Sequence, residues 1–399
     1  MNLLRSERWA AVLLLVAAAL GLLLANTSAG PGLLALKTEH LELPWLGLDL
    51  SIGHWISDGL LAIFFFIVAV ELKRELVIGE LNSLSKALLP AIAAVGGVVV
   101  PALIYLAFTA GTATVDGWPI PTATDIAFAL GVLAVFGTWI PTRVRVFLLA
   151  LAVLDDLIAI LIIAFFFTSD ADLASLGFAG IAIALFGAVS RMMKPRSAWI
   201  LSRRPQWPIV GVLILLGVLA WYFVYQSGVH ATIAGVALGL VMARRPGGRA
   251  VHALEPWSNG VVLPLFALSA AMVAVPQLSP SQLDPAFWGI LVGLPVGKIV
   301  GILIGGGIGA LVARRRDSTP LTWGDLLVVG ALGGIGFTVS LLMNELAFAG
   351  LPEVADEGTL AVLLGSGVAI VVSAIAVSLR SAQYRRRGAK AGVGGAFSR

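Results

Sequence analysis

Long apolar stretches recur along the whole chain, and they constrain its fold more than any other feature of the sequence. A run of about 17–25 apolar residues is long enough to cross a bilayer as a helix. Hydrophobic residues make up 59% of the chain and charged residues only 12%, whereas soluble domains carry roughly 25% charged residues. The sequence therefore predicts an all-α polytopic membrane protein with twelve spans. They are residues 8–27, 54–76, 86–109, 121–137, 143–168, 172–190, 207–225, 228–243, 257–275, 286–312, 325–349 and 358–380.

The positions of the basic residues predict how these spans are oriented. If the N-terminus is cytoplasmic, all but Lys37 and Lys298 of the 26 Lys and Arg residues fall on the cytoplasmic side. Cytoplasmic loops of membrane proteins carry an excess of Lys and Arg. Both termini are therefore expected in the cytoplasm. On a soluble protein the net charge of +4 would suggest an acidic partner. Here the basic residues lie in loops between spans, where they set the topology, and we expect no nucleic-acid partner.

The segments between the expected spans are too short to hold a soluble domain. We expect a single membrane domain over residues 1–380, followed by a basic, Gly-rich, disordered cytoplasmic tail over 381–399 that contacts anionic lipid. Residues 41–51 partly alternate between apolar and polar. They predict either an exposed hairpin that serves self-association or an ordinary loop. The chain has no Cys, which excludes disulfides and thiolate metal sites.

Two of the expected spans are interrupted. The fourth, residues 121–137, is short and begins with Pro121 and helix-poor Thr residues, and the eleventh has four glycines within residues 330–336. Each Gly costs a helix about 1 kcal/mol against Ala. Spans three to five run opposite to spans ten to twelve, and each trio is interrupted in its second member. This pattern predicts inverted repeats with a binding site at the repeat interface, where unwound backbone is tolerated.

Four glycines on the tenth span predict a packing surface. Gly297, Gly301, Gly305 and Gly309 repeat every four residues and therefore form one ridge along a helix. Small residues in such a row let two membrane helices approach closely.

Four charged residues lie well inside the expected spans. Asp155 and Asp156 lie roughly 15 Å into the fifth span, and Lys298 lies about 18 Å into the tenth. Asp125 follows Thr124 at the interruption of the fourth span. An ionised Asp at that depth costs at least about 2.5–3.5 kcal/mol. The cost predicts a role in handling protons or cations; the alternative is two buried acids satisfied by neighbours with no further role.

The surroundings of these residues indicate what each does. Broken helices point positive N-terminal ends and negative C-terminal ends into the membrane. Asp125 can neutralise the former and Lys298 the latter. Asp155 and Asp156 are about 100° apart around their helix, so one faces a water-filled funnel and the other a partner such as Lys298. Carboxylate, hydroxyl and carbonyl oxygens suit Na⁺ or Li⁺, and a site that holds either a cation or protons is an exchanger.

A second group of charged residues lies nearer the membrane surface. Glu71, Arg74 and Glu75 end the second span at its cytoplasmic face. They are either an interfacial charge cluster or a proton entrance that responds to pH. His230, near the outer end of the eighth span, is either a hydrogen-bonded interfacial histidine or a residue that tunes the pH response.

Several stretches together resemble the NhaA-type sodium/proton antiporters. The matching stretches are residues 64–76, 120–131, 152–157, 228–235, 297–298 and 333–338, which extend over essentially the whole membrane portion. The Thr124-Asp125 and Asp155-Asp156 pairs carry most of the specificity. The resemblance implies twelve helices with crossed, interrupted helices four and eleven. It also implies electrogenic exchange of entering protons for exported Na⁺ or Li⁺, in a bacterial cytoplasmic membrane, by a protein that is not an enzyme and needs no cofactor.

The resemblance also implies roles for particular residues. Asp156 is the main carrier of the cation and the proton, Asp155 is its partner and pairs with Lys298, and Thr124 is a ligand. Asp125 compensates charge. The positions that the family associates with pH response are Glu71, Arg74, Glu75 and His230. A homodimer is implied through the segment 41–51.

One stretch departs from the family pattern. After the eighth span, family members can carry an acidic residue immediately before a histidine, and here Val251 precedes His252 while a carboxylate stands at Glu255. This difference in the position of a carboxylate bears on the pH response of the protein.

Other functions account for fewer of these features. A passive cation channel fits the charges, although broken-helix repeats favour alternating access. A retinal protein would use Lys298 as a Schiff base, but seven spans would be expected. An intramembrane aspartyl protease needs two separated Asp residues, one of them in a Gly-x-Gly-Asp-like context that this chain does not contain.

Overall fold

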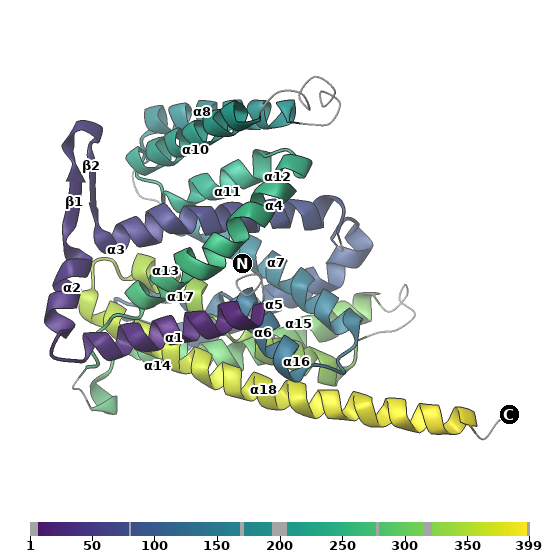
Figure 1. Ribbon diagram of the computed structural model, residues 1–399. Coiled ribbons are helices and arrows are strands. Elements are labelled where there is room, and N and C mark those ends of the chain that lie inside the picture. Colours follow the sequence, from purple (N-terminus) through teal and green to yellow (C-terminus); the bar gives the residue numbers. More distant parts are fainter. Residues whose placement is uncertain are drawn as a thin grey trace. The chain divides into compact units, whose positions relative to one another are not determined.

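The computed structural model of the protein describes residues 7–79, 81–167, 171–193, 206–276, 279–313 and 321–396. Most of these residues are helical (Figure 1). The chain divides into two compact units. Unit 1 comprises Leu13–Gly79 and Ile160–Met272 with Met1–Arg5, and unit 2 comprises Ser6–Val12, Glu80–Ala159 and Val273–Arg399.

Unit 1 contains a β-ribbon and most of the shorter helices. Its elements are α1 (Glu7–Ala25, from Leu13 onward), α2 (Gly30–Thr38), β1 (His40–Leu43), η1 (Pro44–Leu46), β2 (Leu48–Ser51), α3 (Ile52–His54), η2 (Trp55–Leu60), α4 (Leu61–Val77), α8 (Leu173–Met192), α10 (Trp207–Gln226), α11 (Thr232–Val241), α12 (Arg244–Trp257), η6 (Ser258–Val262) and α13 (Leu263–Ala270).

The segment that the sequence leaves open between a hairpin and a loop forms an antiparallel ribbon. β1 pairs with β2 in a register that places His40 opposite Ser51 and Leu43 opposite Leu48. Gly47 closes the turn with φ of 62°, a left-handed conformation that suits Gly because it has no Cβ. Leu48 and Leu50 are buried, so one face of β2 packs inward, whereas β1 is exposed.

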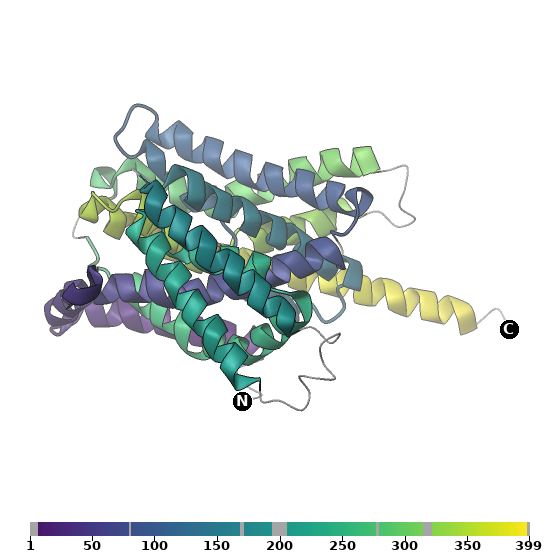
Figure 2. The same ribbon diagram turned by 90° about the horizontal axis from the view of Figure 1, so that it is seen from above.

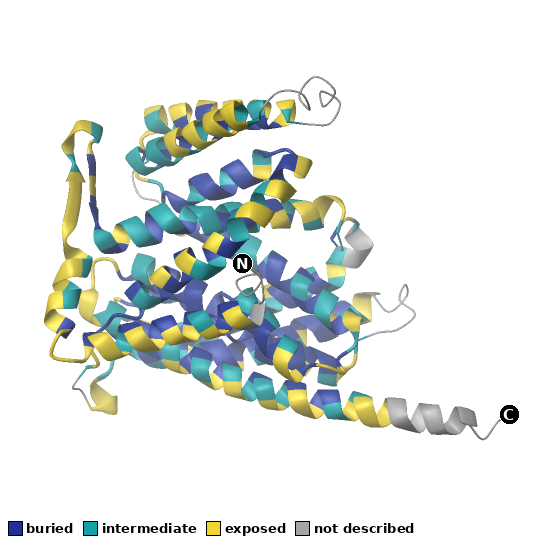
Figure 3. Cartoon of the chain, viewed as in Figure 1, coloured by how far each residue is buried: buried dark blue, intermediate teal, exposed yellow. Residues whose placement is uncertain are grey.

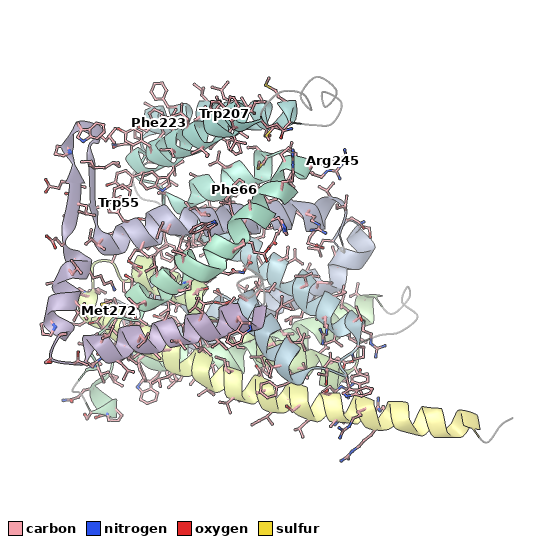
Figure 4. The ribbon with its side chains drawn as sticks, viewed as in Figure 1. Trp55, Phe66, Trp207, Phe223, Arg245 and Met272 are labelled. Atoms are coloured by element: carbon pink, nitrogen blue, oxygen red, sulfur yellow. The ribbon has the colours of Figure 1, made fainter. Side chains whose placement is uncertain are left out.

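Two helix pairs organise the rest of unit 1. α4 packs closely on α11. The close approach is seen at Gly235, where a Cβ would lie 2.1 Å from the carbonyl oxygen of Ala62. α8 and α10 lie side by side in both views (Figures 1 and 2) and carry many exposed apolar residues (Figure 3). Figure 4 labels Trp207 at the start of α10 and Phe223 near its end. In a membrane protein such apolar surface contacts lipid.

Unit 2 contains the longer helices and both interrupted spans. Its elements are α5 (Leu84–Thr109), η3 (Val115–Gly117), η4 (Ile120–Thr122), α6 (Ile126–Phe136), α7 (Thr142–Phe166, to Ala159), η7 (Pro280–Gln282), α14 (Pro285–Val292), η8 (Gly293–Gly297), α15 (Lys298–Ala313), α16 (Trp323–Gly333), α17 (Phe337–Ala347) and α18 (Pro352–Ala396).

The glycine ridge of the tenth span packs against α5, as the sequence predicts. A Cβ at Gly301 would lie 2.2 Å from the carbonyl oxygen of Gly96, and one at Gly305 would lie 2.5 Å from that of Ile92. Both neighbours are backbone atoms, so no side-chain movement can make room. The two helices therefore approach at backbone distance.

The apolar helices confirm the prediction of an all-α polytopic membrane protein. Among the described residues, eight helices are long and apolar enough to span a membrane, or up to ten if two bent pairs each count as one span. The bent pairs are α1 with α2, at 111°, and α16 with α17, at 50°. These ten match ten of the twelve expected spans.

The eighth and ninth expected spans are helical but shorter than the sequence suggests. α11 has 10 residues, about 15 Å of helix, which is half of a hydrocarbon core of about 30 Å. The ninth expected span is divided between the π-helical turn η6 and α13. Unbroken hydropathy cannot distinguish these short helices from full spans, because the residues around their ends are apolar too.

The sequence predicts a disordered tail over residues 381–399, but its described part is helical, because α18 continues through residue 381 to Ala396. Ser381 and Tyr384 account for the start of this extension, since both contact other parts of unit 2. Residues 397–399 lie outside the described chain.

Candidate cation and proton site

The fourth span is broken at residues 123–125. The short helix η4 ends at Thr122, the backbone is extended at Ala123 and Asp125, and α6 begins at Ile126. Pro121 has no N–H group and Thr is a poor helix former, so helical hydrogen bonding is weak here. The break is buried throughout, and its backbone groups therefore need partners inside the protein.

The eleventh span is broken at residues 334–336, where the sequence is rich in Gly. A Cβ at Gly336 would lie 2.2 Å from Ser340 Oγ, and one at Gly334 would lie 2.9 Å from the carbonyl oxygen of Leu294. Gly334 and Gly336 both have negative φ. These glycines are thus required by close approach of neighbouring atoms, rather than by a left-handed backbone.

The two breaks supply hydrogen-bond partners to each other. The backbone N–H of Asp125 donates to the carbonyl of Ile335 at 2.6 Å, and the Thr124 hydroxyl donates to the carbonyl of Gly333 at 2.8 Å. The Ser340 hydroxyl donates to the carbonyl of Ile120 at 2.7 Å. Side-chain hydroxyls therefore satisfy the last carbonyls of both first half-helices, which have no helical partner of their own.

The carboxylate of Asp125 caps two helices at once. Oδ1 accepts the backbone N–H groups of Ala127 and Phe128 at 3.1 and 3.2 Å, at the start of α6. Oδ2 accepts the backbone N–H and the hydroxyl of Thr338 at 3.2 and 2.6 Å, at the start of α17. A negative charge is thus in contact with the positive ends of two helices.

Asp155 and Lys298 form a buried ion pair. The Lys298 ammonium lies 2.8 and 2.7 Å from the two carboxylate oxygens, and the side chains are 1% and 0% exposed. Asp155 comes from the middle of α7, and Lys298 is the first residue of α15 after the π-helical turn η8.

Asp156 and Thr124 complete the group. The Thr124 hydroxyl, which donates to the Gly333 carbonyl, lies close to the Asp155 carboxylate, so the acid pair lies beside the break in the fourth span. Asp156 is partly buried and interacts electrostatically with the Lys298 ammonium. The structure thus brings together the residues that the sequence proposes for the cation, all within unit 2.

The ligand chemistry of this group suits a small hard cation. It offers carboxylate, hydroxyl and backbone carbonyl oxygens, the donor types that hard cations take. Within the described part of the chain, no three His, Cys, Asp or Glu side chains are placed to hold a metal ion. The site offers two carboxylates together with neutral oxygens.

The residues proposed for pH response lie in unit 1. Glu71, Arg74 and Glu75 are on the last turns of α4, and Glu71 also interacts electrostatically with Glu255 on α12. The carboxylate that departs from the family pattern thus belongs to the same charge cluster. His230 Nδ1 lies 3.3 Å from Asp58 Oδ1.

Several residues at the breaks have no counterpart among the predicted site residues. Thr338 binds Asp125, Ser340 binds the end of η4, and the hydroxyl oxygen of Ser366 on α18 accepts the backbone N–H of Phe337 at 3.1 Å. Thr338 lies in a stretch that resembles the family, which is a signal for its importance. Ser340 and Ser366 are ordinary small polar residues in apolar helices, and only their contacts distinguish them.

Known proteins match this sequence over most of its length. The family model described as Na⁺/H⁺ antiporter 1 matches residues 1–377. The protein named Na(+)/H(+) antiporter NhaA 2 of Clavibacter michiganensis is 62% identical over 391 residues, which cover 98% of this chain and 94% of that protein.

More distant relatives have the same kind of name. Proteins named Na(+)/H(+) antiporter NhaA from Tropheryma whipplei (strain Twist) and Thermobifida fusca are 46% and 44% identical. The matches cover 94% and 96% of this chain, and 94% and 95% of those proteins. The relatives are named as antiporters, which are transporters rather than enzymes. The chain therefore belongs to the Na⁺/H⁺ antiporter 1 family.

Proposed function

We propose that this protein exports Na⁺, or Li⁺, in exchange for protons by alternating access. The observation that carries the proposal is the buried pair of Asp155 and Lys298, with Asp156 and Thr124 beside it, at the crossing of two broken helices. Acids and a base at membrane depth are costly to insert, so such groups mark ion pathways. The names of the relatives support the same exchange.

In this proposal the two acids hold either protons or the cation. Asp156 is the main carrier and Asp155 its partner. When Na⁺ binds, the carboxylates give up protons on the side to which the site is open. When Na⁺ leaves on the other side, protons return to the carboxylates. The Lys298 ammonium compensates the negative charge of Asp155 whenever that carboxylate is ionised and no cation is bound to it. Thr124 supplies an oxygen ligand.

Asp125 keeps the crossing intact in this scheme. Its charge is shared between two helix N-termini, so the carboxylate stabilises both broken helices whichever ion is bound. We propose that it compensates charge and does not carry the cation. Na⁺, Li⁺ and H⁺ are the cargo, and we expect no cofactor.

The exchange is proposed to be regulated by pH through unit 1. Glu71, Arg74 and Glu75 form one charge cluster with Glu255, and His230 contacts Asp58. Protonation of such groups changes their contacts, which is how a pH signal would reach the helices that carry them.

We place the protein in the cytoplasmic membrane of a bacterium, with both termini in the cytoplasm, on the distribution of Lys and Arg. Its partners are then the lipid bilayer and a second copy of the chain. The exposed strand β1 of the ribbon supports a homodimer, because an exposed strand can pair with another. No nucleic-acid partner is proposed.

The test is ion exchange by the full-length protein in sealed vesicles. We expect Asp156→Asn to abolish Na⁺-dependent proton flux while the protein remains folded, because an amide cannot exchange a proton for Na⁺. The matched control is Asp116→Asn, an exposed acid of unit 2 outside the site, which should retain exchange. Robust exchange by Asp156→Asn would reject its role. Na⁺ flux with no coupled proton movement would indicate a passive channel.

A further inference from the structure

A second polar cluster lies at the other end of α16, away from the proposed cation site. We call Arg143, Asp325, Arg380 and Tyr384 the Tyr384 cluster. The Arg380 guanidinium donates to Asp325 Oδ1 at 3.0 Å, and Asp325 is fully buried. The Tyr384 hydroxyl donates to the same carboxylate, with oxygen–oxygen distances of 2.8 and 3.0 Å. Thr322 also contacts Arg380 and caps α16.

Three separate helices meet at the Tyr384 hydroxyl oxygen. It accepts hydrogen bonds from Arg143 Nη2 at 3.2 Å and from Arg380 Nη2 at 3.3 Å. Arg143 lies in the first turn of α7, Asp325 lies in the first turn of α16, and Tyr384 is on α18. The hydroxyl is thus the atom through which α7 is joined to the ion pair of α16 and α18.

The same turn of α18 also holds the connection between α6 and α7. The backbone N–H of Trp139 donates to the Ser381 hydroxyl oxygen at 3.2 Å, and Arg145 donates to the carbonyl of Gly137 at 2.9 Å. The contacts at this end of unit 2 therefore involve α7, α16, α18 and the connection between α6 and α7.

α16 connects the Tyr384 cluster to that site. It has 11 residues, about 16 Å, and all of its residues from Asp325 to Gly333 are buried except Leu327. At its far end the Gly333 carbonyl accepts the Thr124 hydroxyl. A short helix in close-packed surroundings moves as a unit, because such an interior has little free volume. A shift at Asp325 is therefore transmitted to Gly333.

α7 provides the second connection. Arg143 lies in its first turn, and Asp155 follows about 18 Å further along the same continuous helix. The Tyr384 hydroxyl therefore fixes the start of the helix that carries the acids against the start of the helix whose end meets Thr124.

We propose that Tyr384 is a positioning residue for the cation site, through its hydroxyl group. The hydroxyl sets the position of α16 relative to α7, and so keeps the Gly333 carbonyl, Thr124 and Asp155 in one arrangement. The Arg380–Asp325 pair alone would hold α16 to α18. The proposal concerns the additional link to α7, and it rests on the proposed function because it assumes that Thr124 and Asp155 bind the cation.

The test removes the hydroxyl and nothing else. Tyr384→Phe keeps the ring and leaves the Arg380–Asp325 pair in place. In vesicles containing the full-length protein, we expect the KM for Na⁺ to rise about tenfold, the effect of losing a hydrogen bond to a charged group. The maximal rate should stay close to that of wild type, because every proposed ligand is still present.

The matched control is Tyr222→Phe. Tyr222 is a partly buried tyrosine of unit 1 whose hydroxyl donates to the carbonyl of Leu46 at 2.8 Å, so the chemical change is identical and the place differs. It should leave the KM for Na⁺ unchanged. An equal KM in the Tyr384→Phe and Tyr222→Phe proteins would overturn the proposal.

A second variant separates positioning from general stability. Arg143→Lys keeps the charge but removes the guanidinium that reaches Tyr384, and it should raise the KM in the same direction. Because the hydrogen bond from Arg143 to the Tyr384 hydroxyl is lost in both variants, the double variant should be no worse than Tyr384→Phe alone. Multiplied effects would contradict a shared role. Arg143→Lys also provides the test if Tyr384→Phe does not fold.

A readout without transport keeps this inference distinct from the proposed function. Na⁺ that binds the folded protein raises its unfolding temperature, so the half-saturating Na⁺ concentration can be measured in detergent. Tyr384→Phe should raise that concentration about tenfold, and an unchanged value would count against the positioning role. If wild type shows this stabilisation by Na⁺ but no proton flux, exchange is refuted while the inference is still tested.

Discussion

At the scale of single residues, the ion pair of Asp155 and Lys298 places two opposite charges in the interior of unit 2. Both side chains are removed from solvent and lie within 2.8 Å of each other. Removing one partner of such a pair strands a buried charge, which typically costs about 3–5 kcal/mol, whereas replacing both by neutral groups of similar volume is often nearly neutral. The pair as a whole therefore adds little to the free energy of unfolding, but removing either partner alone would lower that free energy.

We predict that Lys298→Met lowers the free energy of unfolding by about 3–5 kcal/mol, measured as a reduced unfolding temperature in detergent. The double variant Lys298→Met with Asp155→Asn should recover most of that loss, because no charge is left unpaired. If the double variant is as unstable as the single one, the loss comes from packing of the lysine side chain and not from the stranded carboxylate.

Residue types and positions were enough to select the acids and the lysine for the proposed site. Asp155, Asp156 and Lys298 are conspicuous because ionisable groups are rare in apolar runs. Thr338 and Ser366 could not be chosen in the same way, because hydroxyl side chains are common in membrane helices and can bond to their own backbone. Ser366 is distinguished only by its contact with the start of α17, and Thr338 by its contact with Asp125 and by its place in a stretch that resembles the family.

At the scale of elements, α5 and α15 are held together by the absence of side chains. The glycine ridge of α15 meets backbone atoms of α5, so any Cβ must push the helices apart. Elsewhere in the chain a glycine within a helix faces open space: no atom lies within 4 Å of a Cβ built at Gly177 on α8.

We predict opposite effects of one substitution at these two places. Gly301→Ala should lower the free energy of unfolding by about 1–3 kcal/mol or more, since the added methyl overpacks a backbone contact. Gly177→Ala should raise it by up to about 1 kcal/mol through helix propensity. Thermal unfolding of both variants checks the prediction. If both substitutions shift the unfolding temperature equally and in the same direction, α5 and α15 can move apart to accommodate the added methyl group.

The sequence predicts the interruptions of the fourth and eleventh spans, because Pro121 and the Gly-rich stretch weaken local helical bonding. It does not show that α11 is only 10 residues long, since the residues flanking this helix are also apolar. Nor does it show why Gly334 must be Gly. That reason is the approach of the Leu294 carbonyl oxygen from η8, which exists only once the chain is folded.

At the scale of the whole molecule, the net charge that crosses the membrane in each cycle determines whether a membrane potential can drive turnover. If two protons enter for each Na⁺ that leaves, one net charge crosses the membrane in every cycle. A potential of 100 mV then supplies about 2.3 kcal/mol per cycle. This energy corresponds to a change of about fiftyfold in the Na⁺ gradient at which exchange stops, since about 1.4 kcal/mol is a factor of ten.

We predict that an imposed potential of 100 mV shifts that balancing Na⁺ gradient by about fiftyfold. The measurement is the Na⁺ ratio at which net proton flux in vesicles falls to zero, with and without the potential. Asp156→Asn vesicles, which should not exchange ions, provide the control for leakage. An unchanged balancing ratio would identify an electroneutral exchanger.

The double cap at Asp125 has a mechanical consequence. Since a single carboxylate closes both α6 and α17, separating them would leave at least one helix end with bare N–H groups in a dry interior. Sliding one broken helix past the other would therefore break the hydrogen bonds of at least one cap, whereas rotating the two helices together would break neither. Whatever movement exposes the acids to opposite sides of the membrane must carry this crossing as one rigid piece.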